Sequence, residues 1–191
     1  MTTVYFVRHC KSNSRNHDDF SRELTEQGLK DRELVTRFFK DKEIGAVLSS
    51  PYKRAIDTVK PVADERGLVI RTFDDLRERE TGRGWIEDFL DYVKAQWTDM
   101  NYKFPEGESL LDVQARNVAV LEDIVREYEG QNVVVGSHGT ALSTIVNYYD
   151  KSFGFEEFYE IIDIMPWIVA FEFDENGNFT GLRRFVPGED C

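Results

Sequence analysis

The sequence predicts an α/β fold, a three-layer α/β/α sandwich whose mostly parallel sheet has an antiparallel edge strand and a helical insertion. Short apolar runs alternate with amphipathic stretches of helical period along most of the 191 residues, which is typical of a parallel sheet covered on both faces. Asn176 and Gly177 separate two β-rich runs near the end, and this dipeptide favours a hairpin. The length fits a single domain over 1–191, with the insertion at about 80–108.

The first half of the chain alternates three predicted strands with two predicted helices. The strands are short apolar runs: 4–7, 44–48 and 68–73. The first helix follows Gly28 over 29–40 and has apolar residues along one face. The second helix has Ser50 as its cap and Pro51 at its first position, a combination that starts helices, and Gly67 ends it.

The second half contains the most strongly amphipathic stretch of the chain, which predicts a helix over 109–128. A continuous apolar strand at 133–135 follows it, and the hairpin strands are 168–173 and 179–185. Residues 85–104 fit this alternation poorly and carry aromatic residues at helical spacing. We therefore expect them to form the inserted helix over one edge of the sheet.

The chain is acidic, with a formal net charge of −12 from 24 Lys and Arg against 36 Asp and Glu. Such a surface argues against nucleic-acid and anionic-membrane partners, since both need a basic footprint. No run approaches the ~18 apolar residues of a membrane span, and Cys10 and Cys191 suggest no disulfide framework. We therefore expect a cytoplasmic protein. The net charge does not exclude a small phosphorylated substrate, because capture depends on a few groups at short range.

Residues that can do chemistry follow the predicted strands, at the edge of an open α/β sheet where ligands bind. We expect these residues to converge there: Arg8, His9, Arg54, Glu78 or Glu80, and Ser137-His138-Gly139. Guanidinium groups fork onto phosphate oxygens, and an imidazole can act as a nucleophile or proton carrier. The helix after Gly139 would aim free backbone N–H groups into the same space. Phosphoryl transfer through histidine uses all of these parts, and no ligand spacing suggests a metal or other cofactor.

The string Phe6-Val7-Arg8-His9 resembles the opening of the histidine phosphatase superfamily, the phosphoglycerate mutase-like proteins, whose hallmark is Arg-His-Gly after the first strand. Further motifs follow in that family's order: Leu24-Thr25-Glu26-Gln27-Gly28, Ser49-Ser50-Pro51-Tyr52-Lys53-Arg54-Ala55, Leu76-Arg77-Glu78 with Gly82 and Trp85, Gly107-Glu108-Ser109, and Ser137-His138-Gly139. The resemblance covers about residues 4–146. Arg-His alone is a weak signal, whereas five or six motifs in the same order are a specific one.

The resemblance implies a role for each of five side chains. His9 would attack the phosphoryl group and become phosphohistidine. Arg8, Arg54 and His138 would hold the phosphoryl oxygens and stabilise the transition state. Glu78 would protonate the leaving alcohol and then activate the incoming water.

Four positions leave alternatives open. Cys10 stands where the family has Gly after the histidine. The Asn that the family often places six residues after the histidine is replaced, and Asn16 lies close enough in sequence to supply that amide. Lys11 could meet a second anionic group or be solvated. Glu80 competes with Glu78 as the acid, and the spacing from the preceding leucine favours Glu78.

Three functions remain compatible with these residues. We expect a phosphomonoester phosphatase acting on a small phosphorylated metabolite, as a monomer or homodimer. A phosphoglycerate mutase-type phosphotransferase is the first alternative, but 85–104 offers only Lys94 and Lys103 among several carboxylates, a poor clamp for a substrate carboxylate. A non-catalytic member that binds phosphorylated ligands is the second.

Overall fold

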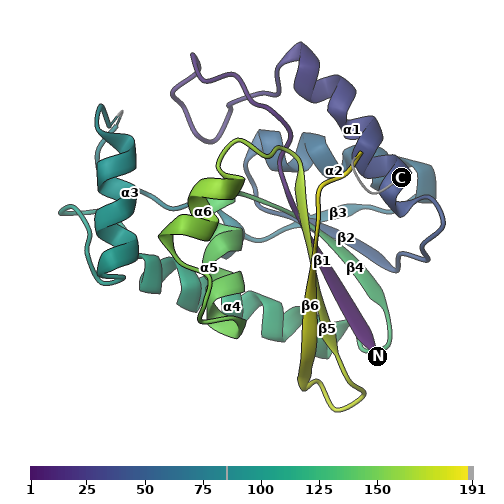
Figure 1. The fold of residues 1–191 in the computed structure, drawn as a ribbon. Coiled ribbons are helices and arrows are strands. Elements are labelled where there is room, and N and C mark those ends of the chain that lie inside the picture. The colour runs from purple at the N-terminus through teal and green to yellow at the C-terminus, as the bar shows by residue number, and fades with distance from the viewer. Residues whose placement is uncertain (85, 189–191) are drawn as a thin grey trace.

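The computed structural model describes residues 1–84 and 86–188, and within them six strands form one mixed sheet (Figure 1). The strands are β1 (Thr2–Arg8), β2 (Ala46–Ser49), β3 (Ile70–Thr72), β4 (Asn132–Ser137), β5 (Trp167–Phe173) and β6 (Phe179–Phe185). They lie in the order β3-β2-β4-β1-β5-β6. The first four are mutually parallel, and the β5–β6 hairpin is antiparallel at one edge. The predicted mostly parallel sheet with an antiparallel edge is therefore confirmed.

Helices cover both faces of this sheet. They are α1 (Glu26–Phe39), α2 (Lys53–Arg66), α3 (Phe89–Thr98), α4 (Leu110–Glu127), α5 (Gly139–Tyr149) and α6 (Phe155–Ile161), with a 3-10 turn, η1, at Asp74–Leu76. Helices α1 and α2 pack on one face, and α4 and α5 pack on the other (Figure 1). This arrangement is the predicted three-layer sandwich. Among the described helices, none combines the length and apolar character that a bilayer crossing requires.

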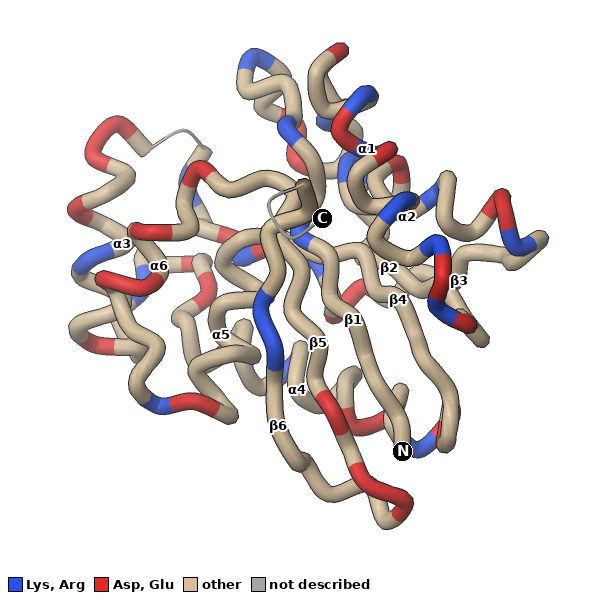
Figure 2. Tube along the Cα trace, turned by 45° about the vertical axis from the view of Figure 1, so that its right-hand side comes forward, with Lys and Arg blue, Asp and Glu red and all other residues tan. Residues whose placement is uncertain are grey.

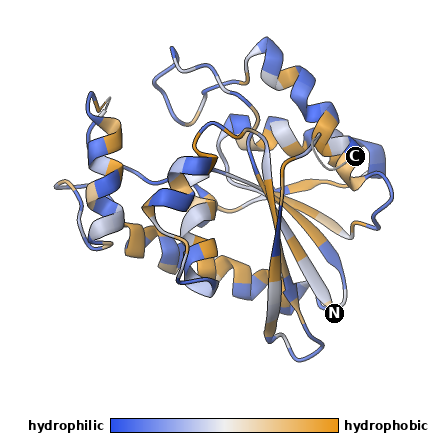
Figure 3. Cartoon of the chain, in the orientation of Figure 1, coloured by the Kyte–Doolittle hydropathy of each residue, from blue (hydrophilic) through white to orange (hydrophobic). Residues whose placement is uncertain are grey.

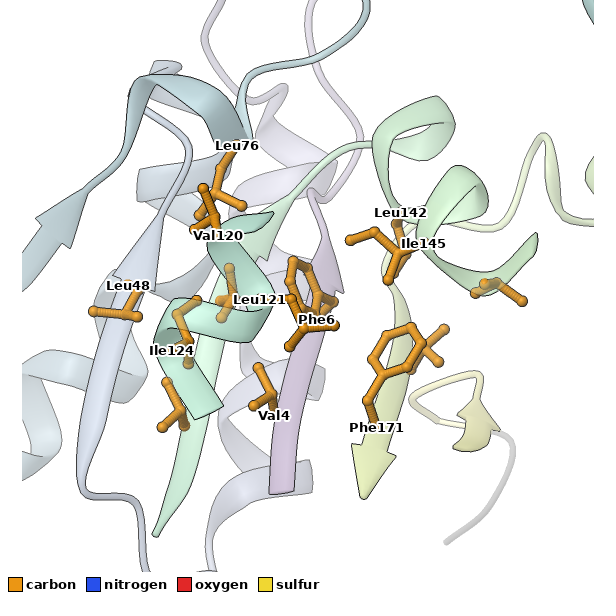
Figure 4. Packing of buried hydrophobic residues seen from close by; sticks show 14 of the residues in the cluster. Val4, Phe6, Leu48, Leu76, Val120, Leu121, Ile124, Leu142, Ile145 and Phe171 are labelled. Atoms are coloured by element: carbon orange, nitrogen blue, oxygen red, sulfur yellow. The ribbon is translucent and has the colours of Figure 1, made fainter. Parts of the chain in front are cut away.

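Two buried clusters hold the layers together, one on each face of the sheet. Successive residues of β1 point to opposite faces, so that Val4 and Phe6 enter one cluster whereas Tyr5 and Val7 enter the other. Figure 4 shows Phe6 facing Leu121 of α4 and Phe171 of β5. Orange, hydrophobic segments run through the central strands in Figure 3, while the outward helix faces are blue. Burial of β1 on both faces explains why its sequence is a continuous apolar run.

Two helices begin at positions that differ from the predictions. Helix α1 begins at Glu26, capped by the Thr25 side chain, and Gly28 lies inside it rather than before it. Gly28 is required there because a Cβ would overlap the carbonyl oxygen of Lys11. Helix α2 begins at Lys53 rather than Pro51. The Ser50 hydroxyl accepts from the N–H of Tyr52 at 3.2 Å and contacts His138, and it does not cap the helix.

The segment between η1 and α4 contains the predicted inserted helix, which is shorter than expected. Helix α3 occupies only 89–98 of the predicted 85–104, and it contacts α6 (Figure 1). Trp85 lies outside the described residues. The sequence did not predict α6 itself, a short helix in a stretch where aromatic and acidic residues show no clear period.

The register of the central strands brings distant residues to one edge. Strands β1 and β4 pair in parallel with Arg8 opposite Ser137, so that His9 and His138 follow side by side. Strand β2 pairs with the other side of β4, with Ser49 opposite Gly136. All three strands therefore end at the same edge, where ligands bind in sheets of this kind.

Candidate active site

A cleft of about 330 Å³ lies at this edge. Its walls include His9, Arg54 and Glu78, three of the predicted site residues, together with Arg22 and Arg79. Charged residues lie mainly on helices and loops around the largely uncharged central strands (Figure 2). The cleft thus gathers several cations in a protein whose net charge is −12.

The imidazole of His9 is buried and held in one orientation. Its Nδ1 atom lies 2.8 Å from the carbonyl oxygen of Cys10, so Nδ1 carries the hydrogen and Nε2 has a free lone pair. Burial, followed by the positive charges of Arg54 and Arg8, holds the pKa of His9 well below 6.5. The imidazole is therefore neutral near pH 7, as a nucleophile must be.

His138 is fully buried beside His9, with the two ring centroids 5.4 Å apart. Its Nε2 atom is 2.7 Å from the hydroxyl of Ser50, and its Nδ1 atom has no partner among the described residues. Burial and the nearby charge of Arg54 hold its pKa well below 6.5. Ser50 of the predicted motif therefore orients a histidine rather than capping a helix.

Arg8 is buried against backbone carbonyls at the end of α6. Its Nη1 donates to Ile161 and Ile164 at 2.6 and 3.1 Å, and its Nη2 donates to Ile162 at 2.8 Å. A Cβ added to Gly139 would lie 3.1 Å from Nε of Arg8, so the glycine lets the guanidinium approach. Burial lowers the pKa of Arg8 to about 10, which leaves it charged.

Arg54 is 2 % exposed and contacts the loop that follows β1. Its Nη1 donates to the backbone carbonyl of Asp19 at 2.6 Å, and its Nη2 lies 3.2 Å from the Asp19 carboxylate. The same carboxylate oxygen is 3.2 Å from Nη2 of Arg22. One acidic side chain thus bridges two guanidinium groups that line the cleft with His9.

The carboxylate of Glu78 occupies the N-terminus of α5. It accepts hydrogen bonds from the N–H groups of Thr140 and Ala141, both at 2.9 Å. These N–H groups were expected to be free for a ligand, but the carboxylate satisfies them because a helix N-terminus attracts negative charge. Gly139 begins that helix. Glu80 lies outside the cleft, where it pairs with Arg77 at 2.9 Å.

A salt-bridge network fixes the loop that carries Glu78. Arg116 of α4 donates to the carbonyls of Asp75, Arg77 and Glu78 at 2.7, 2.7 and 3.2 Å. It also binds the Glu108 carboxylate at 2.7 and 2.8 Å. The Gly107-Glu108-Ser109 motif therefore supports the loop and starts α4, with Ser109 as its cap.

Three predicted or doubtful positions lie away from the cleft. The Asn16 side chain donates to Glu23 at 2.9 Å, so its amide is engaged in the loop. The Lys11 side chain is exposed and is not part of the cleft wall. Cys10 is buried, its N–H donates to Thr58 at 3.0 Å, and burial raises the thiol pKa to about 12. The thiol is thus an unreactive packing group next to His9.

Arg22 and Arg79 line the cleft but were not among the predicted site residues. Arg22 lies in an irregular loop just before the Leu24-Thr25 motif, and nothing in that loop's pattern predicts which way it points. Arg79 lies in an alternating run of charges that resembles an exposed loop, yet its side chain is buried. Nowhere in 1–84 and 86–188 do three or more His, Cys, Asp or Glu side chains gather as a metal site requires.

Comparisons with known proteins agree with this geometry. The model of the histidine phosphatase superfamily (branch 1) matches residues 4–178. A probable phosphoglycerate mutase of Yersinia pestis is 30% identical over 161 residues, which cover 77% of this chain and 74% of that protein. The YhfR structure from Bacillus stearothermophilus has a TM-score of 0.76 at 25% identity and covers 94% of this chain and 95% of its own. A phosphoserine phosphatase from Entamoeba histolytica, in complex with 3-phosphoglyceric acid, has a TM-score of 0.76 at 20% identity and covers 94% of both chains.

Proposed function

This chain belongs to the histidine phosphatase superfamily, and from that membership we propose that it is a phosphomonoester phosphatase acting through a phosphohistidine at His9. The observation that carries the proposal is the orientation of His9. Its Nδ1 is bound to the Cys10 carbonyl, and Nε2 is free in a cleft lined by Arg22 and Arg54. A neutral imidazole with a free lone pair, next to guanidinium groups, is arranged to attack a phosphoryl group.

In the first step, the Nε2 lone pair of His9 attacks phosphorus and the bond from phosphorus to the ester oxygen breaks. Arg54 and Arg22 neutralise the phosphoryl oxygens, and the substrate displaces the Asp19 carboxylate from them. His138 accepts a hydrogen bond from the Ser50 hydroxyl at Nε2, so its Nδ1 carries the hydrogen and can donate a hydrogen bond to a phosphoryl oxygen. Glu78 enters this step as the protonated acid and gives its proton to the leaving alkoxide; it lines the same cleft.

In the second step, Glu78 accepts a proton from water as the water oxygen attacks phosphorus. The bond between phosphorus and Nε2 breaks, inorganic phosphate leaves and the imidazole is restored. Each proton that Glu78 gives in the first step returns in the second, so the enzyme ends unchanged and no metal or redox cofactor is required.

A phosphatase is favoured over a mutase by the two lysines of the inserted segment. Lys103 pairs with Asp112 at 2.7 Å, and Lys94 lies over the ring of Phe155. Neither lines the cleft, so neither can hold a substrate carboxylate there. Structural neighbours described as phosphatases support this choice. A mutase remains the alternative function, because the Yersinia relative is described as a probable phosphoglycerate mutase.

Rapid quenching in alkaline detergent after reaction with radiolabelled phosphomonoesters tests the proposal. We expect an acid-labile, alkali-stable phosphohistidine on the wild type and none on His9→Ala, whose circular dichroism should be unchanged. A panel containing 3-phosphoglycerate should yield inorganic phosphate without the 2-phospho isomer. Isomerisation without phosphate release would favour the mutase, and the absence of both label and turnover would favour the non-catalytic alternative.

Three features remain predictions. They are the single-domain organisation, the monomeric or homodimeric state and the cytoplasmic location. The substrate is proposed to be a small phosphorylated metabolite, and the acidic surface disfavours large polyanions.

A further inference from the structure

Thr58 places a buried hydroxyl on the inner face of α2. It lies one helical turn after Arg54, and its side chain is fully buried. Its neighbours on this face, Val59 and Val62, belong to an apolar cluster. A hydroxyl in such surroundings is costly unless it is hydrogen-bonded, and a valine has nearly the same shape. The contacts of the hydroxyl therefore indicate what this residue does.

The Thr58 hydroxyl joins α2 to the loop that follows β1. It donates to the carbonyl of Arg54 at 2.8 Å and accepts from the N–H of Cys10 at 3.0 Å. Donation to the preceding turn is common for a threonine in a helix, and Thr144 of α5 makes such a bond to Ala141 at 2.7 Å. The bond from the Cys10 N–H is the additional one, and it leaves the helix.

Three consecutive residues after β1 are each fixed by a different element. The N–H of His9 donates to the last carbonyl of β4 at 3.0 Å, and the N–H of Cys10 donates to Thr58. The carbonyl of Lys11 accepts from the N–H of Thr25, the N-cap of α1, at 2.9 Å. The Cys10 carbonyl lies between the last two contacts. Because peptide units are planar, these contacts determine its direction, toward Nδ1 of His9 at 2.8 Å.

The direction of the Cys10 carbonyl decides which nitrogen of His9 carries the hydrogen. We propose that Thr58 is a positioning residue, which holds the Cys10 backbone so that the Nε2 lone pair of His9 stays free for attack. This inference rests on the proposed function for the identity of the nucleophile. Without the hydroxyl, the buried N–H of Cys10 loses its acceptor. The backbone then turns toward another acceptor and moves the carbonyl away from His9.

The same hydroxyl relates His9 to Arg54. The backbone carbonyl of Arg54 accepts from Thr58, and the guanidinium of Arg54 lines the cleft with His9. One hydroxyl thus connects the loop of the nucleophile to the helix that carries a phosphate-binding arginine. The connection matters for rate, because a displacement of about 1 Å in an active site can cost about 100-fold.

Two pairs of variants isolate the hydroxyl: wild type against Thr58→Val, and Thr58→Ser against Thr58→Ala. Loss of the hydroxyl should lower kcat/KM for p-nitrophenyl phosphate by about 10- to 100-fold in each pair. Thr58→Ser should stay within about threefold of the wild type. Competitive inhibition by inorganic phosphate should change by less than about threefold, because the guanidinium of Arg54 keeps its place on α2.

The tautomer of His9 can be measured without substrate. In protein with isotope-labelled histidine, we expect the nitrogen chemical shifts of wild-type His9 to be those of the Nδ1–H form. In Thr58→Val and Thr58→Ala the two shifts should move toward each other, as they do when both tautomers are populated. His9→Ala identifies the signals. This measurement needs no turnover, so it separates failure of the inference from failure of the proposed function.

Thr144→Val is the matched control, because Thr144 is also fully buried and its hydroxyl bonds to its own helix. It should change neither the rate nor the tautomer of His9. Thermal unfolding identifies the folded variants, and either pair suffices. The inference is overturned if folded variants without the hydroxyl keep the wild-type tautomer or rate, or if phosphate inhibition weakens as much as the rate falls. An inactive wild type whose His9 tautomer depends on the Thr58 hydroxyl would contradict the proposed function alone.

Discussion

The Nδ1 atom of His9 lies 2.8 Å from the carbonyl oxygen of Cys10, the next residue in the chain. This contact fixes the tautomer of the imidazole through local backbone geometry. Cys10 replaces the glycine of the family, and its side chain is fully buried in the hydrophobic cluster rather than in the cleft wall. The backbone of Cys10, rather than its thiol, serves the site.

Burial of His9 and His138 should make stability fall in mild acid. Both have folded-state pKa values well below 6.5, so the unfolded chain binds more protons as the pH falls below 6.5. Stability from these groups is complete above pH 6.5 and is lost below it. We expect the free energy of unfolding to drop by about 1.4 kcal/mol per histidine between pH 7.5 and 5.5.

Urea denaturation at pH 7.5, 6.5 and 5.5 measures this loss. His9→Gln should remove about half of the pH dependence that the two buried histidines cause. His17→Gln, which changes the exposed third histidine, should leave that difference in place. A wild type equally stable at pH 7.5 and 5.5 would contradict the prediction.

Gly28→Ala should destabilise the protein by about 2–4 kcal/mol. The new Cβ would overlap the Lys11 carbonyl oxygen, and a backbone atom cannot move aside cheaply. Gly181→Ala on β6 is the control, because its Cβ would meet nothing within 4 Å. That variant should be unchanged or stabilised by up to about 1 kcal/mol through a less flexible unfolded chain. Chemical denaturation of both variants compares them, and equal effects would refute the packing argument.

Glu78→Gln should lower turnover of alkyl phosphates by about 10²–10⁴-fold while sparing p-nitrophenyl phosphate in the first step. The amide oxygen can still accept from one of the two N–H groups of α5, but the amide cannot give a proton to an alkoxide. Glu80→Gln should change neither rate, because Glu80 pairs with Arg77 outside the cleft. Stopped-flow and steady-state assays with both esters separate the two carboxylates. A large loss of turnover in Glu80→Gln alone would show that Glu80, and not Glu78, is the acid.

Asp19→Asn should tighten inhibition by inorganic phosphate about three- to tenfold. In the unliganded protein the Asp19 carboxylate bridges Arg54 and Arg22, so a phosphoryl group must compete with it for the same donors. Asp18→Asn is the control, since Asp18 bonds instead to Ser21 and Phe20. Weaker phosphate inhibition in Asp19→Asn would show that this carboxylate positions the two guanidinium groups.

The sequence predicted most of the sheet because its strands are buried on both faces. Such strands are continuous apolar runs, and Arg8, Ser49 and His138 mark their carboxyl ends. Because ligands bind at those ends, residues from distant parts of the chain could be assigned to one site from the sequence alone. Helix starts were less predictable, because Ser50 can cap a helix or bond to a histidine, and only tertiary packing decides between these.

The positions of two arginines in the cleft could not be predicted from the sequence. Arg22 and Arg79 lie in segments without helical or strand period, so the sequence carries no signal for their direction. The burial of Arg79 depends on Gln96, Tyr92 and Phe89, which come from the inserted segment. A charge pattern alone cannot distinguish such a residue from a solvated one.

The pairing of β1 with β4 also determines when activity can appear during synthesis. His9 is synthesised 129 residues before its neighbour His138, which directly follows the strand beside it. No nascent chain that ends before β4 can contain the pair of histidines. Recovery of activity during refolding should therefore report insertion of β4 between β1 and β2, a long-range event that is slow compared with helix formation.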